Sequence, residues 1–162
     1  MPEPHAVLNA LSAEDARAAL LRCCGSTRWV ASMMEQRPFG STATLHADAD
    51  AAWATVGRDD VLEAFAAHPR IGARATPDAW ARQEQARVGD ADGDTQRALA
   101  AGNAAYLERF GYLFIVCATG KSAPELLALL RARLGNEPAR ELAIAAREQA
   151  LITHLRLEKL AA

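Results

Sequence analysis

The chain has 162 residues, with 18 Lys plus Arg against 20 Asp plus Glu and a formal net charge of −2. This length fits a single domain, expected over residues 1–162, that buries a sizeable core without disulfides. The balanced charge excludes the strong basic field of a protein that coats nucleic acid. Alanine supplies 38 residues, whereas Phe, Trp and Tyr together supply nine. Because alanine loses no side-chain entropy in a helix, this composition predicts an all-α fold.

Neither end of the chain shows a recognisable targeting signal, and no apolar run approaches the roughly 20 residues of a membrane helix. We therefore expect a cytoplasmic protein without a membrane span. The three cysteines cannot all pair, and the adjacent Cys23 and Cys24 lack the spaced second half of a zinc site. Reduced, mostly buried thiols are expected.

The first two predicted helices have clear start and stop signals. Ser12 caps a helix that runs to Cys24, and we expect Gly25 to end it in the left-handed conformation that glycine tolerates. Ser26 caps the second helix, which ends before Pro38. Spacings of three and four give this second helix one apolar face, formed by Trp29, Val30, Met33 and Met34.

Two more helices are expected between residues 45 and 69. The first covers about 45–56. The second is capped by Asp59 or Asp60 and ends at Pro69. Its inward-facing side chains are expected to be Leu62 and Phe65.

The next two helices flank a predicted surface loop. Thr76 followed by Pro77 predicts a cap and a first helical position for a helix that runs through Glu84. Gly and Asp gather over residues 87–95, which is typical of a surface loop. A sixth helix is expected over residues 95–110.

An apolar run, YLFIVCAT, occupies residues 112–119 and is rich in β-branched and aromatic residues. Since it stands alone among helices and has no sheet to join, we expect a buried extended segment or an irregular helix. Its backbone donors and acceptors then need partners other than a sheet.

Two helices complete the chain. Ser122 and Glu125 form a capping box for a helix that ends at Gly135. Pro138 begins the last helix, which runs to about Leu160. The predicted fold class is therefore an all-α bundle of about eight helices with one buried extended segment.

The usual local signatures of nucleotide, metal and nucleophile sites are absent, including Gly-x-Gly-x-x-Gly, the Walker loop, Gly-x-Ser-x-Gly and His-Glu-x-x-His. No metal and no organic cofactor is expected. The candidates for chemistry are instead polar residues that lie where the helix pattern breaks or beside an apolar stripe.

His68 is the first candidate, because Pro69 keeps it out of helical geometry at the end of a helix. Helix carbonyls favour its charged form, whereas Arg70 and Arg74, if they lie close, favour the neutral ring. The alternative is a histidine that only hydrogen-bonds within a turn. The remaining histidines are expected at surface positions or, for the first of them, in a frayed terminus: His5, His46 and His154.

Glu84 and Gln85 form the second candidate site, with Trp80 one turn before Glu84 on the same helix face. Such a face can receive a cyclic amide or urea, since a carboxylate accepts N–H bonds and a carboxamide both donates and accepts. The alternative is a solvated helix face.

Arg156 is the third candidate and borders the apolar stripe of the last helix, one turn from both Ile152 and Leu160. A partly desolvated guanidinium binds carboxylates strongly and bidentately. The alternative is an arginine whose stem covers the core while its head reaches water.

Taken together and in order, these segments resemble the family of 2-oxo-4-hydroxy-4-carboxy-5-ureidoimidazoline (OHCU) decarboxylases, which complete the oxidation of urate to allantoin. The likeness runs from Leu8 to Leu160. Its motifs are Cys-Gly-Ser-Thr-Arg-Trp, Arg-Pro-Phe, His-Pro-Arg-Ile-Gly, Glu-Gln, Asn-x-x-Tyr-x-x-Arg-Phe-Gly-Tyr, Leu-Phe-Ile-Val-Cys-Ala-Thr-Gly-Lys-Ser and Ile-x-x-x-Arg-Leu. No single motif is decisive, but the ordered series is specific.

The resemblance implies an all-helical homodimer that converts the small molecule OHCU to (S)-allantoin without metal or organic cofactor. It implies that His68 is the catalytic acid or base and that Glu84 and Arg156 orient the substrate ring. The other implied substrate contacts are Pro69, Ala81, Arg82, Gln83, Gln85, Val116, Cys117, Ala118, Thr119 and Gly120. The family commonly has serine where this chain has Ala81, so that a hydroxyl contact is missing or replaced.

The implied chemistry needs few side chains. Loss of carbon dioxide leaves an electron pair that pyridoxal, thiamine or a metal usually accepts, but here the conjugated ring of the substrate can accept it. The enzyme then has to orient the carboxylate, stabilise the developing charge and move one proton. We hypothesise that backbone N–H groups of Val116–Gly120 receive the ring oxygens.

Two other classes of function stay open at this point. One is a non-enzymatic helical interaction module with the Trp29, Met33 and Met34 face as an exposed groove for a partner. The other is a hydrolase with Cys117 as nucleophile, although the neighbours in Phe-Ile-Val-Cys-Ala suggest a buried, inert thiol.

Overall fold

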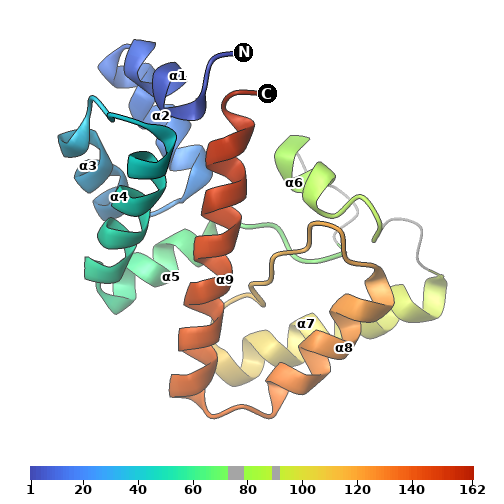
Figure 1. The fold of residues 1–162 in the computed structure, drawn as a ribbon. Coiled ribbons are helices and arrows are strands. Elements are labelled where there is room, and N and C mark those ends of the chain that lie inside the picture. Colours follow the sequence, from blue (N-terminus) through green and yellow to red (C-terminus); the bar gives the residue numbers. More distant parts are fainter. Residues whose placement is uncertain (73–78, 89–91) are drawn as a thin grey trace. The chain divides into compact units, whose positions relative to one another are not determined.

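The structure, a computed structural model, describes residues 1–72, 79–88 and 92–162. These residues form nine α-helices and no strand (Figure 1), which confirms the all-α fold class with one helix more than the expected eight or so. The chain divides into two compact units, one of residues 1–64 and 149–162 and one of residues 65–148. Within the described ranges, no helix has the length and apolar character needed to cross a membrane.

The first unit contains α1 (Pro4–Ala10), α2 (Ala13–Cys23), α3 (Thr27–Gln36), α4 (Thr42–Thr55), most of α5 (Arg58–Ala66) and the end of α9 (Pro138–Lys159). Three of these helices begin at a serine whose hydroxyl accepts the N–H three residues later, namely Ser12, Ser26 and Ser41. The core holds large side chains with no exposed surface, including Leu8, Leu20, Trp29, Met33 and Leu45.

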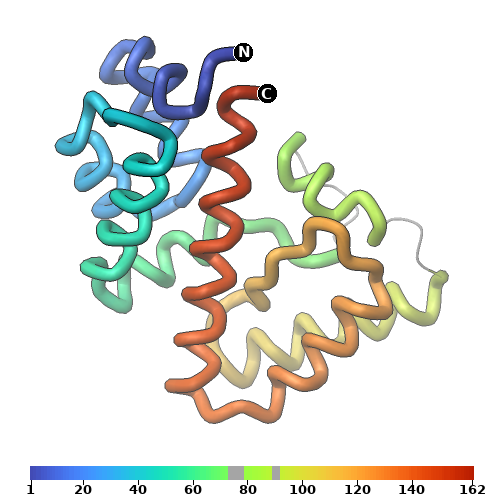
Figure 2. The backbone as a smooth tube through the Cα atoms, viewed as in Figure 1, coloured from blue at the N-terminus to red at the C-terminus, as the bar shows by residue number. Residues whose placement is uncertain are grey.

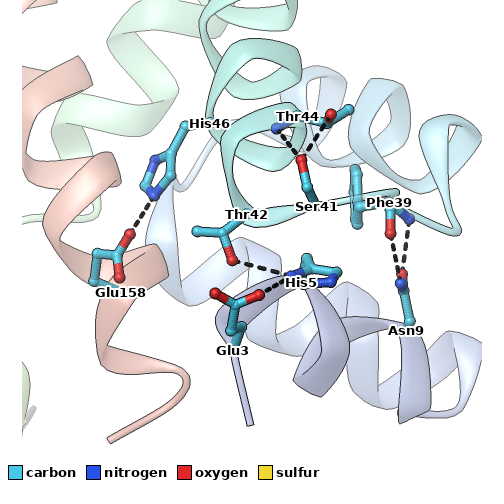
Figure 3. Close-up of polar contacts among 9 residues, drawn as sticks. All are labelled: Glu3, His5, Asn9, Phe39, Ser41, Thr42, Thr44, His46 and Glu158. Atoms are coloured by element: carbon cyan, nitrogen blue, oxygen red, sulfur yellow. Dashed lines mark hydrogen bonds and ion pairs between the residues drawn. The ribbon is translucent and has the colours of Figure 1, made fainter.

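The N-terminal helix α1 is the element that the sequence analysis missed. Pro4 occupies its first turn, a position that suits proline and was an available signal. His5 lies in this helix with its Nδ1 3.0 Å from the Thr42 hydroxyl, and the Asn9 side chain pairs with both backbone groups of Phe39 at 2.8 and 2.9 Å (Figure 3). The expectation of a frayed terminus at His5 was therefore wrong, because these contacts fasten α1 to the start of α4.

His46 and His154, which were expected at surface positions, are half-buried and pair with each other. Their rings stack with centroids 4.6 Å apart, and their Nδ1 atoms lie 2.5 Å from each other. The Nε2 atoms contact carboxylates, at 2.5 Å from Glu158 for His46 (Figure 3) and 2.7 Å from Asp50 for His154. These contacts join α4 to the end of α9 within the first unit.

Several helix ends differ from their predicted mechanism. The helix over 13–23 ends through Cys24 in extended backbone (φ −147°), and Gly25 is not left-handed. Packing explains this helix end, because the extended backbone buries Cys24, which is 1% exposed. At the start of α5, Asp60 lies inside the first turn and accepts the Gly57 N–H at 3.1 Å, so it caps from within the helix instead of preceding it.

The apolar face of α3 is covered. Trp29 and Met33 have no exposed surface and Met34 is half-buried. The Trp29 indole N–H donates to the Ala49 carbonyl at 3.0 Å, which links α3 to α4. This burial removes the exposed groove that the interaction-module hypothesis required.

The second unit contains α6 (Ala79–Glu84), α7 (Gly93–Phe110), α8 (Ala123–Leu134) and the first part of α9. Figure 2 shows α7 and α8 lying side by side, and the two helices pack against each other. Asp92 caps α7 and left-handed Gly111 (φ 82°) ends it. The predicted surface loop over 87–95 is therefore too long at its end, because the Asp92 side chain starts the helix at Gly93.

The last two helices agree with prediction. Ser122 and Glu125 form the expected capping box of α8, and Gly135 follows its last residue. Helix α9 begins at Pro138 and ends at Lys159. The predicted Thr76-Pro77 helix start lies outside the described residues.

Candidate active site

His68 lies just beyond α5, where the sequence placed it. Helix α5 ends at Ala66, and the His68 N–H donates to the Phe65 carbonyl at 3.2 Å in a final turn. Both His68 and Pro69 are half-buried. Part of the imidazole surface is therefore accessible to a bound molecule.

The residues that follow Pro69 are bonded to the turn after α6 and to α7, both in the second unit. The Gln85 carboxamide accepts the Gly72 N–H at 2.9 Å and donates to the Arg70 carbonyl at 3.5 Å. The Asn103 side chain on α7 donates to the Ile71 carbonyl at 2.9 Å. These bonds hold the chain beside His68 in place, and they show that Gln85, a predicted substrate contact, also has a structural role.

Helix α6 and the turn after it present the acidic part of the candidate site. Trp80 and Glu84 are both half-buried and one turn apart, as the spacing predicted. Ala81 is 2% exposed, whereas Arg82 and Gln83 are exposed. The α6 face that carries Trp80 and Glu84 therefore combines an indole and a carboxylate, each with part of its surface accessible.

The apolar run adopts the buried, non-helical form predicted for it. We call residues 112–120 the connecting segment, which joins α7 to α8 (Figure 2). Its middle residues are between 1% and 8% exposed, and these are Phe114, Ile115, Val116, Cys117 and Ala118. The last two residues of the connecting segment, Thr119 and Gly120, are exposed.

Charged side chains hold the backbone of the connecting segment in place of a sheet. The Cys117 N–H donates to Glu148 Oε1 at 3.1 Å, and Lys121 Nζ donates to the Cys117 carbonyl at 2.8 Å. Arg133 donates to the Ile115 carbonyl at 2.6 Å, and Arg87 donates to the Gly120 carbonyl. The prediction that these backbone groups need partners outside a sheet is confirmed.

Burial is the main cause that raises the pKa of the Cys117 thiol. The Thr119 N–H and the Lys121 charge lower this pKa, and the smaller effects of Glu148 and Glu84 raise it, with a net shift upward. A thiol whose pKa is raised is mostly protonated near neutral pH and is a poor nucleophile. This argues against the hydrolase hypothesis.

A buried polar network under the connecting segment escaped the sequence analysis. Arg133 pairs with Glu141 (Nη2 to Oε2 2.5 Å), Tyr106 donates its hydroxyl to the same carboxylate, and Asn136 donates to its other oxygen at 3.0 Å. Arg133 is 7% exposed and Glu141 is fully buried. The available signal was Glu141 on the apolar stripe of α9, one turn before the buried Ala145.

Arg156 lies in the first unit. It is 9% exposed, and its Nη1 donates to the Arg22 carbonyl at 3.0 Å. Burial on the apolar face of α9, with Leu157 beside it fully buried, agrees with the predicted position beside the apolar stripe.

The described contacts therefore join three of the predicted site segments within the second unit. In the turn after α6, Gln85 bonds to the residues that follow His68 and Pro69, and Arg87 bonds to the end of the connecting segment. An imidazole, a carboxylate and an irregular backbone thus belong to one packed unit. Across the described residues, no three His, Cys, Asp or Glu side chains form a group suited to a metal ion.

A model of the OHCU decarboxylase family matches residues 9–158. The chain belongs to the OHCU decarboxylase family. The match covers both compact units, including the segments of His68, Glu84, the connecting segment and Arg156.

Individual relatives agree with this assignment. The chain is 37% identical over 145 residues to the uric acid degradation bifunctional protein TTL of Arabidopsis thaliana, covering 85% of this chain and 45% of that protein. It is 48% identical over 56 residues to the 2-oxo-4-hydroxy-4-carboxy-5-ureidoimidazoline decarboxylase of Amia calva, covering 35% of this chain and 32% of that protein. The chain thus spans less than half the length of these curated relatives.

Solved structures share the fold. A crystal structure of OHCU decarboxylase in the presence of (S)-allantoin matches with a TM-score of 0.80 and 34% identity, covering 93% of this chain and 98% of that chain. A crystal structure of (S)-allantoin synthase matches with a TM-score of 0.74 at 18% identity, covering 94% of this chain and 52% of that chain, which supports the fold alone.

Proposed function

We propose that this protein is a carboxy-lyase that decarboxylates OHCU to (S)-allantoin in urate degradation. Membership of the OHCU decarboxylase family over residues 9–158 is the observation that carries the proposal. The likeness to an OHCU decarboxylase crystallised in the presence of (S)-allantoin supports the same substrate class. The contacts that join the segments of His68, Glu84 and residues 116–120 are consistent with a site for a small polar heterocycle.

In the proposed reaction, the bond between the ring carbon and the carboxylate breaks and carbon dioxide leaves. The electron pair stays with the ring, which delocalises it onto its own oxygen and nitrogen atoms, and a proton then restores the neutral product. The protein supplies orientation, charge stabilisation and one proton transfer. No external electron sink is needed, since the substrate ring provides it.

Each residue has a distinct proposed role. His68 acts on the substrate hydroxyl or delivers the proton to the new carbanion. Glu84 accepts N–H groups of the ring or the ureido tail. Backbone N–H groups of Val116–Gly120 receive the ring oxygens, except the Cys117 N–H, which donates to Glu148. Further contacts come from Pro69 and the turn from Ala81 to Gln85, and Arg156 orients the ring.

Ala81 marks the departure from the family serine. At 2% exposed, this methyl group is packed inside the second unit and offers no hydrogen bond. The proposed site therefore binds the substrate with one hydroxyl contact fewer, or with a neighbouring group in its place. A substrate preference shifted toward a related ureido acid would be visible in the ratio of kcat/KM values.

The deciding experiment generates OHCU in place from urate and uricase and adds the purified protein. We expect optically active allantoin, followed by circular dichroism, to form faster than in the uncatalysed control, and we expect EDTA to leave the rate unchanged. No acceleration would refute the proposed activity. A loss of rate with EDTA that added zinc restores would contradict the proposal of a cofactor-free enzyme.

We further propose that residues 1–162 act as one functional domain, that the protein is a homodimer and that it works in the cytoplasm. The single-domain proposal is supported by a family match that spans both compact units. Sedimentation velocity of the purified chain tests the dimer, with a single species of twice the 17.3 kDa chain mass as the expected result.

A further inference from the structure

We propose that Glu148 is a positioning residue for the reaction, because it holds the Cys117 N–H and thereby sets the backbone of Val116–Gly120. This inference rests on the proposed function, in which that backbone receives the ring oxygens of the substrate. Glu148 was not among the residues that the sequence marked for a role in the site. It lies on α9, 31 residues beyond its partner in the chain, and only the fold brings the two together.

The hydrogen bond between Glu148 and the Cys117 N–H is well placed to fix the backbone of the connecting segment. Glu148 Oε1 accepts the Cys117 N–H at 3.1 Å, and a hydrogen bond to a carboxylate is stronger than one between neutral groups. Cys117 is the second of the five residues proposed to bind substrate, between Val116 and Ala118. A shift at this amide therefore moves the N–H groups on both sides of it.

The other supports of the connecting segment act on its carbonyl groups. Arg133 holds the Ile115 carbonyl, Lys121 holds the Cys117 carbonyl and Arg87 holds the Gly120 carbonyl. These cations fix where the segment lies. Glu148 differs because it accepts an N–H. The bond fixes the rotation of the peptide plane between Val116 and Cys117, while Lys121 holds the carbonyl of the next plane.

Glu148 is less buried than Arg133 and Glu141, which support the fold. Arg133 and its partner Glu141 are buried in the network with Tyr106, so that changes there endanger folding. Glu148 is half-buried, and a half-buried carboxylate can be replaced with a smaller cost in stability. Its function can therefore be tested in a folded protein.

The test uses Glu148→Ala and Glu148→Gln, with Glu108→Ala as the matched control. Glutamine keeps the carbonyl oxygen that accepts the Cys117 N–H, whereas alanine removes it. Glu108 is an exposed glutamate on α7, so its replacement is the same chemical change at a position outside the connecting segment. Each variant is assayed on freshly generated OHCU, and its melting curve and the hydrogen exchange of the Cys117 amide are measured.

We expect Glu148→Ala to lower kcat by about tenfold to a hundredfold with KM within about threefold of the parent, since misplaced donors fail mainly in the transition state. Exchange of the Cys117 amide should quicken, and the melting curve should stay close to that of Glu108→Ala. Glu148→Gln should keep kcat within about threefold of the parent and keep the amide protected.

Two results would overturn the inference. One is a Glu148→Ala protein with parental kcat and KM. The other is a Glu148→Gln protein as impaired as the alanine variant, which would assign the effect to the charge and not to the hydrogen bond. Inactivity of the parent protein would instead refute the proposed function, and amide exchange would still show separately whether Glu148 holds Cys117.

Discussion

At the scale of single residues, the candidate site depends on side chains that fix backbone as much as on those that could do chemistry. Pro69 keeps His68 out of the helix, and the Gln85 carboxamide bonds to the backbone on either side of Ile71. An imidazole on such a fastened turn loses little further entropy when it acts on a bound molecule. This arrangement suits a catalyst that orients its substrate and moves one proton.

The first prediction concerns His68. His68→Asn should fold normally, because asparagine is tolerated before proline and His68 is only half-buried. Its kcat on fresh OHCU should fall by about two to four powers of ten, the usual contribution of a histidine in proton transfer. Stopped-flow decay of OHCU with a parallel melting curve measures both effects. Unchanged decay would remove His68 from the mechanism.

The second prediction separates binding from catalysis at Glu84. Glu84→Ala should raise KM by about tenfold or more, since a hydrogen bond to a charged group contributes roughly 1.5–3 kcal/mol. Its kcat should change much less than in the His68 variant. Glu84→Gln, which keeps an acceptor oxygen, serves as the control with an intermediate KM. A large fall in kcat at constant KM would contradict the binding role.

At the scale of the elements, close helix packing and an irregular segment support each other in the second unit. The small residue Gly102 on α7 lets the buried Leu130 of α8 approach the α7 backbone. The aromatic rings of Tyr106, Phe110, Tyr112 and Phe114 then cluster between α7 and the connecting segment. A non-helical run stays ordered here because rigid helices flank it and charged side chains bond to its backbone.

The third prediction tests this packing. In Gly102→Ala the new Cβ would lie 2.5 Å from Leu130 Cδ2, so that one of the two side chains must shift. Overpacking costs about 1–3 kcal/mol, against a gain of up to about 1 kcal/mol in helix propensity. We expect a net loss of about 1 kcal/mol in the free energy of unfolding, measured with urea.

A double variant provides the control for that loss. Combining Gly102→Ala with Leu130→Ala should give a total smaller than the sum of the two single losses, because the alanine at position 130 makes room for the new methyl group. Additive losses, or a single variant more stable than the parent, would contradict the close contact between α7 and α8.

At the scale of the whole molecule, stability depends on pH through the buried thiols of the first unit. Burial raises the pKa of Cys23 from 9.0 to about 12 and that of Cys24 from 9.0 to about 11. The unfolded chain loses these protons above pH 9 while the folded chain keeps them. The thiols therefore contribute their full stability below pH 9, and this contribution falls as pH rises toward 11 or 12.

The fourth prediction follows from that sign. The free energy of unfolding should fall between pH 9 and pH 10.5, with each thiol contributing a slope of up to about 1.4 kcal/mol per pH unit. The variant Cys23→Ala/Cys24→Ala should show a shallower slope, whatever its absolute stability. Urea titrations followed by circular dichroism at several pH values measure both slopes, and equal slopes would refute the assignment.

Local signals in the sequence determined most of the helices, because caps and breakers act within one turn of the chain. Ser12, Ser26, the Ser122–Glu125 capping box and Pro138 set helix starts that the structure confirms. The ordered motifs likewise determined the family and the all-α fold. The resemblance and the break before Pro69 pointed to His68, and its placement just beyond α5 follows from the pyrrolidine ring of Pro69.

Only the tertiary structure decided which side chains meet across long stretches of chain. The Cys117 amide bonds to a residue 31 positions away in the sequence. The partner of the Ile115 carbonyl is 18 positions away, and the Gly72 N–H that donates to the Gln85 carboxamide is 13 positions away. The Arg133–Glu141 network and the pairing of His46 with His154 likewise depend on helices packing together. Residue spacing predicts only which side chains are neighbours on one helix. Backbone and charged groups that are buried away from water need hydrogen-bond partners, and the packing of distant segments decides which groups these are.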